Sequence, residues 1–214
     1  MNFDPLTTAR RALWIGGAQW AGKTTLAVTL ALRYGLTAYL YDRHDARGHD
    51  DRRVADRVRR GEPPGGPDAE ATWVATDPDR MAAETLAGFP RRFEWVLDDL
   101  SALVTARRVI VEGWGLRPEL VAPLVGSTRQ MVVLVPTPEF RAYQMGRLAR
   151  ATARHPGVSD PQRAWRNRIA RDELVAADAV AHARELGIRV IEVDGSRDAE
   201  AVAGLVAEHF AAYL

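Results

Sequence analysis

The sequence predicts an α/β fold in which helices flank a five-stranded parallel sheet. Two observations lead to this prediction: short runs rich in Val and Ile alternate along the chain with longer stretches of helical periodicity, and most of these runs stop at a glycine or a proline. Continuous apolar runs are typical of parallel strands, because helices cover both faces of such a sheet.

Five apolar runs are expected to form the strands. They are residues 12–16 (ALWIG), 36–42 (LTAYLYD), 107–113 (RRVIVEG), 130–136 (QMVVLVP) and 187–195 (GIRVIEVDG). The first run is followed by residues 24–34, whose apolar side chains recur at helical spacing until Gly35 ends the pattern. A strand, a loop and a helix therefore open the chain.

A helical insertion is expected between the second and third strands. Residues 61–67 (GEPPGGP) are too rich in glycine and proline for a helix or a central strand. Asp77 and Pro78 then make a suitable N-cap and first residue for a helix that runs to about residue 105.

A second, arginine-rich helical segment follows the fourth strand. It runs from about residue 139 to residue 153, and after the loop HPGVSDP a further helix can begin at Asp160 and Pro161 and end at Gly187. The whole chain, residues 1–214, is expected to be one domain. Its expected parts are a core of residues 10–60, 106–140 and 187–214, a helical insertion at about 61–105 and an Arg-rich lid at about 147–172.

The composition narrows the functional classes. Hydrophobic residues make up 47% of the chain and charged residues 27%, no apolar run approaches the ~18 residues of a membrane span, and residues 1–11 lack the apolar region of a signal peptide. Cysteine is absent, which excludes disulfides, thiolate metal sites and a cysteine nucleophile. We expect a cytoplasmic protein that does not associate with membranes. The net charge of +1 argues against nucleic acid as a partner, and no feature specifies an oligomeric state.

Residues 17–24 match the pattern G-x-x-x-x-G-K-[ST] between a predicted strand and a predicted helix, which is the context that this pattern requires. Backbone N–H groups of such a loop surround a phosphate, Lys23 reaches the β- and γ-phosphates, and the Thr24 hydroxyl binds Mg²⁺. Lys23 is also the only lysine of the chain. The motif therefore predicts a P-loop NTPase fold that binds ATP and Mg²⁺. The expected nucleotide-binding residues are Gly17, Ala18, Gln19, Trp20, Ala21, Gly22, Lys23, Thr24 and Thr25.

On this motif and the order of its elements, the chain resembles the P-loop small-molecule kinases of the adenylate-kinase-like group, such as shikimate kinase, gluconate kinase and chloramphenicol phosphotransferase. The resemblance implies an ATP-dependent phosphotransferase that moves the γ-phosphoryl group to a hydroxyl of a small molecule. It also implies that the helical insertion binds the acceptor and that an arginine-bearing lid closes over ATP. Trp20 is a departure, since many of these kinases have a small residue there.

The resemblance also implies roles for carboxylates at strand ends. Asp42 would be the catalytic base that accepts the proton of the acceptor hydroxyl, with Asp45 as its substitute; the alternative for Asp42 is a turn cap. Glu112 would help Thr24 to hold magnesium or would contact the acceptor, and here too a cap is the alternative. His44 and His49 could orient an acceptor, but exposed loop histidines are the expectation for both.

Arginines are the other expected catalytic groups. Arg168 and Arg171 lie one helical turn apart, so both could neutralise charge on the transferred phosphoryl group, as lid arginines do in the kinases that the chain resembles. Arg150 of the lid is expected to contact the nucleotide, and Gly195 and Ser196 resemble the turn that touches adenine in that group. Arg117 would bind an anionic group of the acceptor or cap a loop. Aromatic residues of the insertion are expected in the core rather than in an acceptor pocket: Trp73, Phe89, Phe93 and Trp95.

Two other functions remain open at this point. One is a regulatory ATPase; its GTPase version is excluded by the single lysine, because the guanine motif N-K-x-D needs a second one. The other is a polynucleotide 5′-kinase, which needs a basic groove with stacking aromatics that the balanced charge does not favour.

Overall fold

The structure is a computed structural model that describes residues 4–147 and 157–214. Its five strands form one sheet in the order β2-β3-β1-β4-β5, and every pair of neighbours is parallel. The strands are β1 Leu13–Gly17, β2 Thr37–Leu40, β3 Val109–Glu112, β4 Met131–Pro136 and β5 Arg189–Val193. The predicted five-stranded parallel sheet of a P-loop NTPase fold is confirmed.

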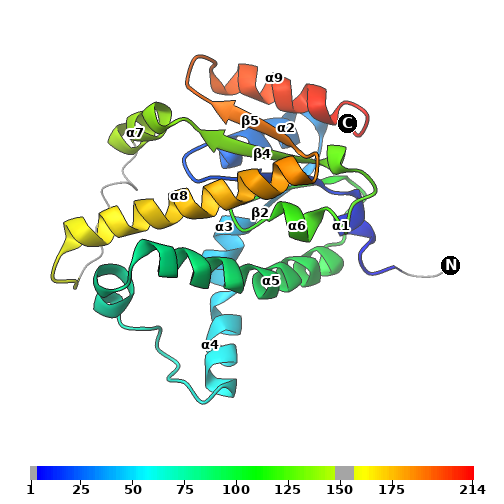
Figure 1. Cartoon of the computed structure of the whole chain (residues 1–214). Helices are drawn as coiled ribbons and strands as arrows, with labels where there is room; N and C mark the ends of the chain where they lie inside the picture. The colour runs from blue at the N-terminus through cyan, green and yellow to red at the C-terminus, as the bar shows by residue number, and fades with distance from the viewer. Residues whose placement is uncertain (1–3, 148–156) are drawn as a thin grey trace.

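Two helices, α2 (Lys23–Tyr34) and α9 (Ala199–Phe210), cover one face of the sheet (Figure 1). Alternate strand residues such as Leu13 and Ile15 face these helices, because successive side chains of a strand point to opposite faces. Trp14, between them, faces the other side of the sheet. Both faces are therefore buried, which explains the continuous apolar runs in the sequence.

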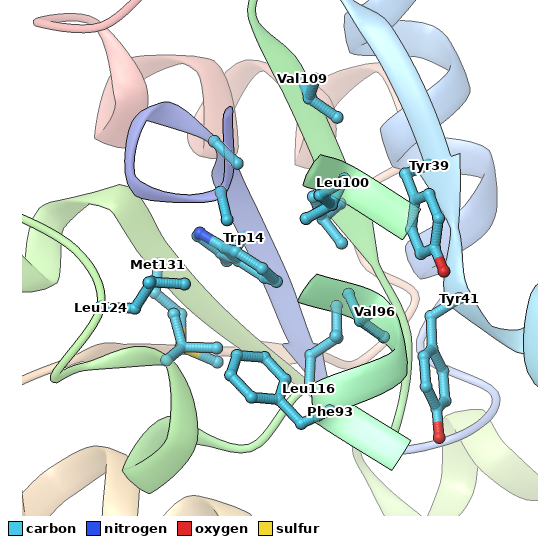
Figure 2. Packing of buried hydrophobic residues seen from close by; sticks show 14 of the residues in the cluster. Trp14, Tyr39, Tyr41, Phe93, Val96, Leu100, Val109, Leu116, Leu124 and Met131 are labelled. Carbon is cyan, nitrogen blue, oxygen red and sulfur yellow. The ribbon is translucent and has the colours of Figure 1, made fainter. Parts of the chain in front are cut away.

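The other face of the sheet is covered by α5 together with three further helices (Figure 1). Figure 2 shows Phe93, Val96 and Leu100 of α5 packed beside Trp14, and the Trp14 and Phe93 ring centres are 5.8 Å apart. The predicted insertion thus shares the C-terminal half of its long helix with the core. The helices of this face are α1 Thr7–Arg11, α5 Pro78–Ala102, α6 Pro118–Val121 and α8 Pro161–Glu185.

Short helical segments connect these layers. Two of them are π-helices, His44–Gly48 and Ala71–Ala75, and a 3₁₀-helix, Thr128–Gln130, precedes β4. The remaining helices are α3 Tyr41–Arg43, α4 Asp50–Arg59, which extends away from the sheet below α5 in Figure 1, and α7 Pro138–Arg147. No described helix combines the length and the apolar character that crossing a membrane requires.

The helix starts at Pro78 and Pro161 agree with the sequence, and the Asp160 side chain caps α8 by accepting a hydrogen bond from the Arg163 amide at 2.8 Å. The predicted strand bounds differ from the observed ones by up to two residues, and one of these differences bears on the candidate site. The second strand ends at Leu40 rather than at Asp42, because Tyr41 begins a helical turn in which its buried ring packs against Gly113 and Gly115 after β3. The division into core, insertion and lid stays a proposal, and residues 148–156 of that lid lie outside the described part.

Candidate active site

The loop between β1 and α2 has the shape of a P-loop, and positive φ angles produce it. Gly17 has φ +107°, and a Cβ there would lie 2.2 Å from the carbonyl oxygen of Leu134, so no other residue fits. Gly22 has φ +79° and caps α2. Within residues 4–147 and 157–214, Trp20 is the single non-glycine residue with a positive φ, +69°.

Trp20 keeps this conformation while its side chain is almost completely buried. A small cavity of about 10 Å³ next to it is also lined by Arg141 of α7 and by Ile169 and Asp172 of α8. The P-loop therefore packs against the two helices that flank the predicted lid. A backbone strain of this kind costs on the order of 1–3 kcal/mol and has to be held by surrounding packing.

Lys23, the first residue of α2, is only 5% exposed. Its Nζ donates a hydrogen bond to the carbonyl oxygen of Ala18 at 2.7 Å, so the ammonium lies over the loop rather than in solvent. A compact ammonium inside a ring of backbone amides is suited to the bridging position between two phosphates.

Glu112 lies at the end of β3 and is fully buried. Its Oε1 accepts a hydrogen bond from the Thr24 hydroxyl at 3.1 Å, and its Oε2 is buried with no hydrogen-bond partner in the described part of the chain. Burial raises the pKa of Glu112 to about 7, although the nearby Lys23 charge opposes the rise. A buried carboxylate beside a threonine hydroxyl is a donor set that fits Mg²⁺. The two residues that were predicted to hold magnesium thus lie within hydrogen-bonding distance of each other.

Asp42 lies in the helical turn α3 just beyond the end of β2. Its Oδ1 accepts a hydrogen bond from the backbone amide of Trp114 at 3.3 Å, which links it to the loop after β3. The close approach depends on Gly113 and Gly115, where a Cβ would lie 2.5 Å from atoms of Tyr41. This contact accounts for the two glycines of the segment EGWG, which the sequence alone did not explain.

A cavity of about 790 Å³ joins these groups. Lys23 and Thr24 line it from the P-loop, Asp42 lines it from α3, and Gly195 lines it from the turn after β5. Most of the other residues predicted to bind nucleotide also line it, namely Gln19, Trp20, Ala21, Gly22 and Thr25. Gly17 and Ala18 do not line the cavity, but Gly17 allows the loop to pass close to Leu134 and Ala18 accepts the hydrogen bond from Lys23. The volume is in the range of small-molecule and cofactor sites.

Helix α7 supplies cavity residues that sequence reasoning missed. Phe140 and Tyr143 have stacked rings with centres 6.3 Å apart, and the guanidinium of Arg147 lies 5.2 Å from the Tyr143 ring centre. The spacing 140, 143, 147 on one helix face was a usable signal, because residues three and four apart are neighbours on a helix. Arg197 and Asp198, after β5, also line the cavity.

The turn after β5 is held by side chain and backbone together. Ser196 donates from both its amide and its hydroxyl to Asp194 Oδ1, at 2.9 and 2.6 Å. Gly195 has φ +83°, and a Cβ there would lie 2.7 Å from the Phe140 ring. Gly195 therefore lets α7 approach the turn. Ser196 shapes the turn but does not line the cavity in this structure.

The predicted lid arginines lie on α8, and neither lines the cavity. Arg171 binds Asp172 Oδ1 through Nε at 2.9 Å and NH2 at 2.6 Å, and its guanidinium is held between the rings of Trp73 and Trp114 at 5.2 and 5.4 Å. Arg168 stacks over the Trp165 ring. The two arginines therefore contact different aromatic rings. Arg150 lies outside the described residues.

Around Arg171 the structure builds an aromatic–arginine cluster, which consists of Trp73, Phe89, Trp114 and Arg171. The Trp114 ring meets the Phe89 ring edge-on at 5.1 Å. Since Trp114 also binds Asp42 through its amide, this cluster lies next to the proposed base. Phe93 and Trp95 are buried, as expected of core residues, and Phe89 is buried as well.

Arg117 is buried and makes hydrogen bonds to α8. It is 1% exposed and donates to Glu119 at 3.2 Å, to the Val175 carbonyl at 3.0 Å and to Asp178. Its role is to fasten α6 to α8. Three hydrogen bonds and burial occupy its guanidinium, which favours the structural alternative for Arg117 over acceptor binding.

Comparison with known proteins gives a similarity of fold. No family model matches the chain, and a search of curated proteins found no match. Among solved structures, shikimate kinase from Aquifex aeolicus is 15% identical with a TM-score of 0.43, and the match covers 93% of this chain and 95% of that one. Shikimate kinase from Acinetobacter baumannii, in complex with shikimate, is 17% identical with a TM-score of 0.44, and the match covers 95% of both chains.

Proposed function

We propose that this chain is a kinase that transfers the γ-phosphoryl group of ATP to a hydroxyl of a small molecule. The observation that carries the proposal is that Lys23, Thr24 and Asp42 line one cavity of about 790 Å³. Phosphate-binding groups and a candidate base that share one cavity are what phosphoryl transfer requires, because that reaction depends mainly on positioning and charge neutralisation.

The nucleotide would be held at three places in this cavity. The P-loop amides and Lys23 would bind its phosphates. Arg147 is the cation that α7 presents to the cavity, and it is available for the same charge. Phe140 and Tyr143 of α7, together with Gly195 in the turn after β5, would contact the adenine base of the nucleotide.

Magnesium would be held by the Thr24 hydroxyl and by Glu112, directly or through water. When bound, the ion supplies positive charge that neutralises phosphate oxygens. The ion would then interact with the buried Oε2 of Glu112, which lacks a hydrogen-bond partner in the described part of the chain. A nearby divalent cation would also favour the ionised carboxylate and so lower the pKa that burial raises to about 7.

Asp42 would act on the acceptor. Its carboxylate would accept the hydroxyl proton while the acceptor oxygen forms a bond to phosphorus and the bond between phosphorus and the departing ADP breaks. The hydrogen bond from the Trp114 amide to Oδ1 would orient the Asp42 carboxylate toward the acceptor. Arg168 and Arg171 keep their proposed role in neutralising charge, which in this arrangement requires a change of side-chain position.

The test is a screen for acceptor-dependent ADP release with hydroxylated metabolites, nucleosides and antibiotics. At least one class should raise ADP release and give a phosphorylated product by mass spectrometry, and Lys23→Ala should abolish both. ADP release that no acceptor changes would refute the kinase proposal and favour a regulatory ATPase. Phosphorylation of polynucleotide 5′ ends instead would also refute the small-molecule acceptor.

A further inference from the structure

Two histidines and one aspartate converge at a place that the proposed kinase mechanism does not use. His44 lies in the first π-helix, His49 immediately precedes α4, and Asp99 lies in α5. Each residue offers one ligand atom, and these three atoms all lie within 4.8 Å of one another. None of the three residues lines the nucleotide cavity.

We propose that His44, His49 and Asp99 bind a divalent transition-metal ion of the zinc type, separate from the magnesium site at Thr24 and Glu112. His49 Nε2 lies 2.8 Å and His44 Nδ1 lies 3.5 Å from Asp99 Oδ2. The second distance is too long for a good hydrogen bond. Ligands that each lie about 2.0–2.1 Å from a tetrahedral zinc ion are roughly 3.3 Å apart, which is close to the observed spacing.

The three side chains are held in position before any ion binds. The His44 ring stacks on Tyr39 with ring centres 4.1 Å apart, and the buried His49 ring lies edge-on to Trp95 at 5.5 Å. The Tyr39 hydroxyl donates to Asp99 Oδ2 at 2.6 Å. Such outer contacts orient metal ligands and are a regular part of metal sites.

The ligand types decide the class of ion. Imidazole nitrogen binds Zn²⁺ and its transition-metal neighbours well, whereas Mg²⁺ and Ca²⁺ prefer oxygen ligands. His44 is half-exposed on one side of the cluster, so a water molecule can complete a set of three protein ligands. The cluster therefore fits zinc with an open fourth position.

A second group with the required residue types does not make a comparable site. Glu119, Asp178 and His182 also lie close together, but the buried guanidinium of Arg117 pairs with both carboxylates. Among the described residues, Asp99 has only one weaker contact of this kind, because Arg52 lies 3.5 Å from its Oδ1, while its Oδ2 faces the two histidines. His182 therefore serves as a matched control for the proposed site.

Metal binding would act on the segment that carries the proposed base. His44 is two residues beyond Asp42, and Asp99 is on the helix that packs against the sheet. An ion bound by these residues would tie the β2–α4 connection to α5. We expect it to raise the midpoint temperature of unfolding.

The experiment is a titration of the tag-free, chelator-treated chain with Co²⁺ and then Zn²⁺, in excess Mg²⁺ to occupy oxygen sites. We expect one equivalent of Co²⁺ with the visible absorption of a four- or five-coordinate ion, displacement by Zn²⁺ and a higher unfolding temperature. His44→Ala should weaken binding roughly 100-fold or more, since changes even in outer contacts cost about 10–100-fold. His44 is half-exposed, so this variant should fold, and circular dichroism checks that it does.

His182→Ala should bind both ions as the wild type does. Absence of a bound equivalent at stoichiometric concentration would overturn the proposal, and so would equal binding by His44→Ala and the wild type. Loss of binding in His182→Ala with retention in His44→Ala would place the ion at the other cluster and would overturn it too. None of these outcomes depends on kinase activity, so the proposal can fail independently of the proposed function.

Discussion

The P-loop is shaped mostly by backbone, whereas the aromatic–arginine cluster beside it is made of side chains. Gly17 and Gly22 give the P-loop its shape within eight consecutive residues. In the cluster, Trp73, Trp114 and Arg171 come from three distant segments and meet only through tertiary packing. The shape of the P-loop is thus built locally, whereas the cluster depends on the packing of several distant segments. The predictions below test how much each of these two regions contributes to activity and to stability.

The largest effect is expected from Lys23→Ala, which removes the one side-chain cation of the P-loop. Turnover should fall at least ~10³-fold, because this charge acts where negative charge develops on the phosphates. Initial rates of ADP release measure the fall, and circular dichroism checks the fold. Arg33→Ala, at the exposed end of the same helix, should stay close to wild type. Near-normal turnover of the Lys23 variant would contradict the P-loop assignment.

Asp42→Asn tests the residue that connects the P-loop cavity with the aromatic–arginine cluster. The amide keeps the size of the side chain and its hydrogen bond from Trp114, but it cannot accept a proton. The value of kcat should fall roughly 10²–10⁴-fold while nucleotide affinity changes little. If Asp42 only caps the turn, asparagine will cap almost as well and activity will stay within a few-fold.

Asp45→Asn is the matched control for Asp42. Asp45 binds Arg53 at 3.0 Å and Arg92 at 3.5 Å, so it lies in a local ion-pair group. We expect its variant to keep kcat and to lose some stability. The opposite result, with a normal Asp42→Asn and an inactive Asp45→Asn, would move the base to Asp45.

Arg117→Ala tests how much the contacts between α6 and α8 contribute to the stability of the folded chain. The variant leaves the Val175 carbonyl and the Asp178 carboxylate without their donors, and loss of one partner of a buried pair costs about 3 kcal/mol. Urea denaturation measures the loss. Activity per folded molecule should change little, and a large rise in the acceptor KM without lost stability would instead return Arg117 to the acceptor site.

Glu112 makes stability depend on pH. A glutamate normally titrates near pH 4.5, and burial raises the pKa of Glu112 to about 7 in the folded chain. Between these two values the unfolded chain is ionised while the folded chain keeps its proton. The free energy of unfolding should therefore fall by roughly 3 kcal/mol as pH rises through this window, and it should not fall further above it.

The measurement compares wild type with Glu112→Gln by urea denaturation across this window, without nucleotide or magnesium. The variant has no carboxyl at this position and should lack this part of the pH dependence. Parallel curves for both proteins would mean that the Glu112 carboxylate is already ionised in the folded chain. Added Mg²⁺ should reduce the dependence in the wild type only.

The smallest effects are expected from Arg168→Ala and Arg171→Ala. Each should lower kcat roughly tenfold and raise the KM for ATP less, if the guanidinium acts mainly in the transition state. Arg166, exposed on the same helix, is the control. Wild-type kcat in both variants would leave Lys23, Arg147 and Arg197 as the described cations that line the cavity, and it would mean that α8 takes no part in the reaction.

The sequence by itself determined the parts that depend on short-range preferences. Apolar runs specified the parallel strands, and the spacing of Gly17, Gly22 and Lys23 specified the P-loop, because φ angles and helix starts depend on neighbouring residues. Pro78 and Pro161 marked helix starts for the same reason. Even the pairing of Thr24 with Glu112 followed, since the ends of adjacent parallel strands meet at one edge of the sheet.

Only the tertiary structure decided which of the remaining polar side chains are buried and which partners they contact. His49 was expected in an exposed loop, yet it is buried against Asp99, which lies 50 positions away. Arg171 was expected to point at phosphate, yet two tryptophans hold it, and Arg117 binds across 58 residues to Val175. Long-range contacts of this kind depend on how whole helices pack, and the pattern of neighbouring residues does not encode the partner that a side chain meets there.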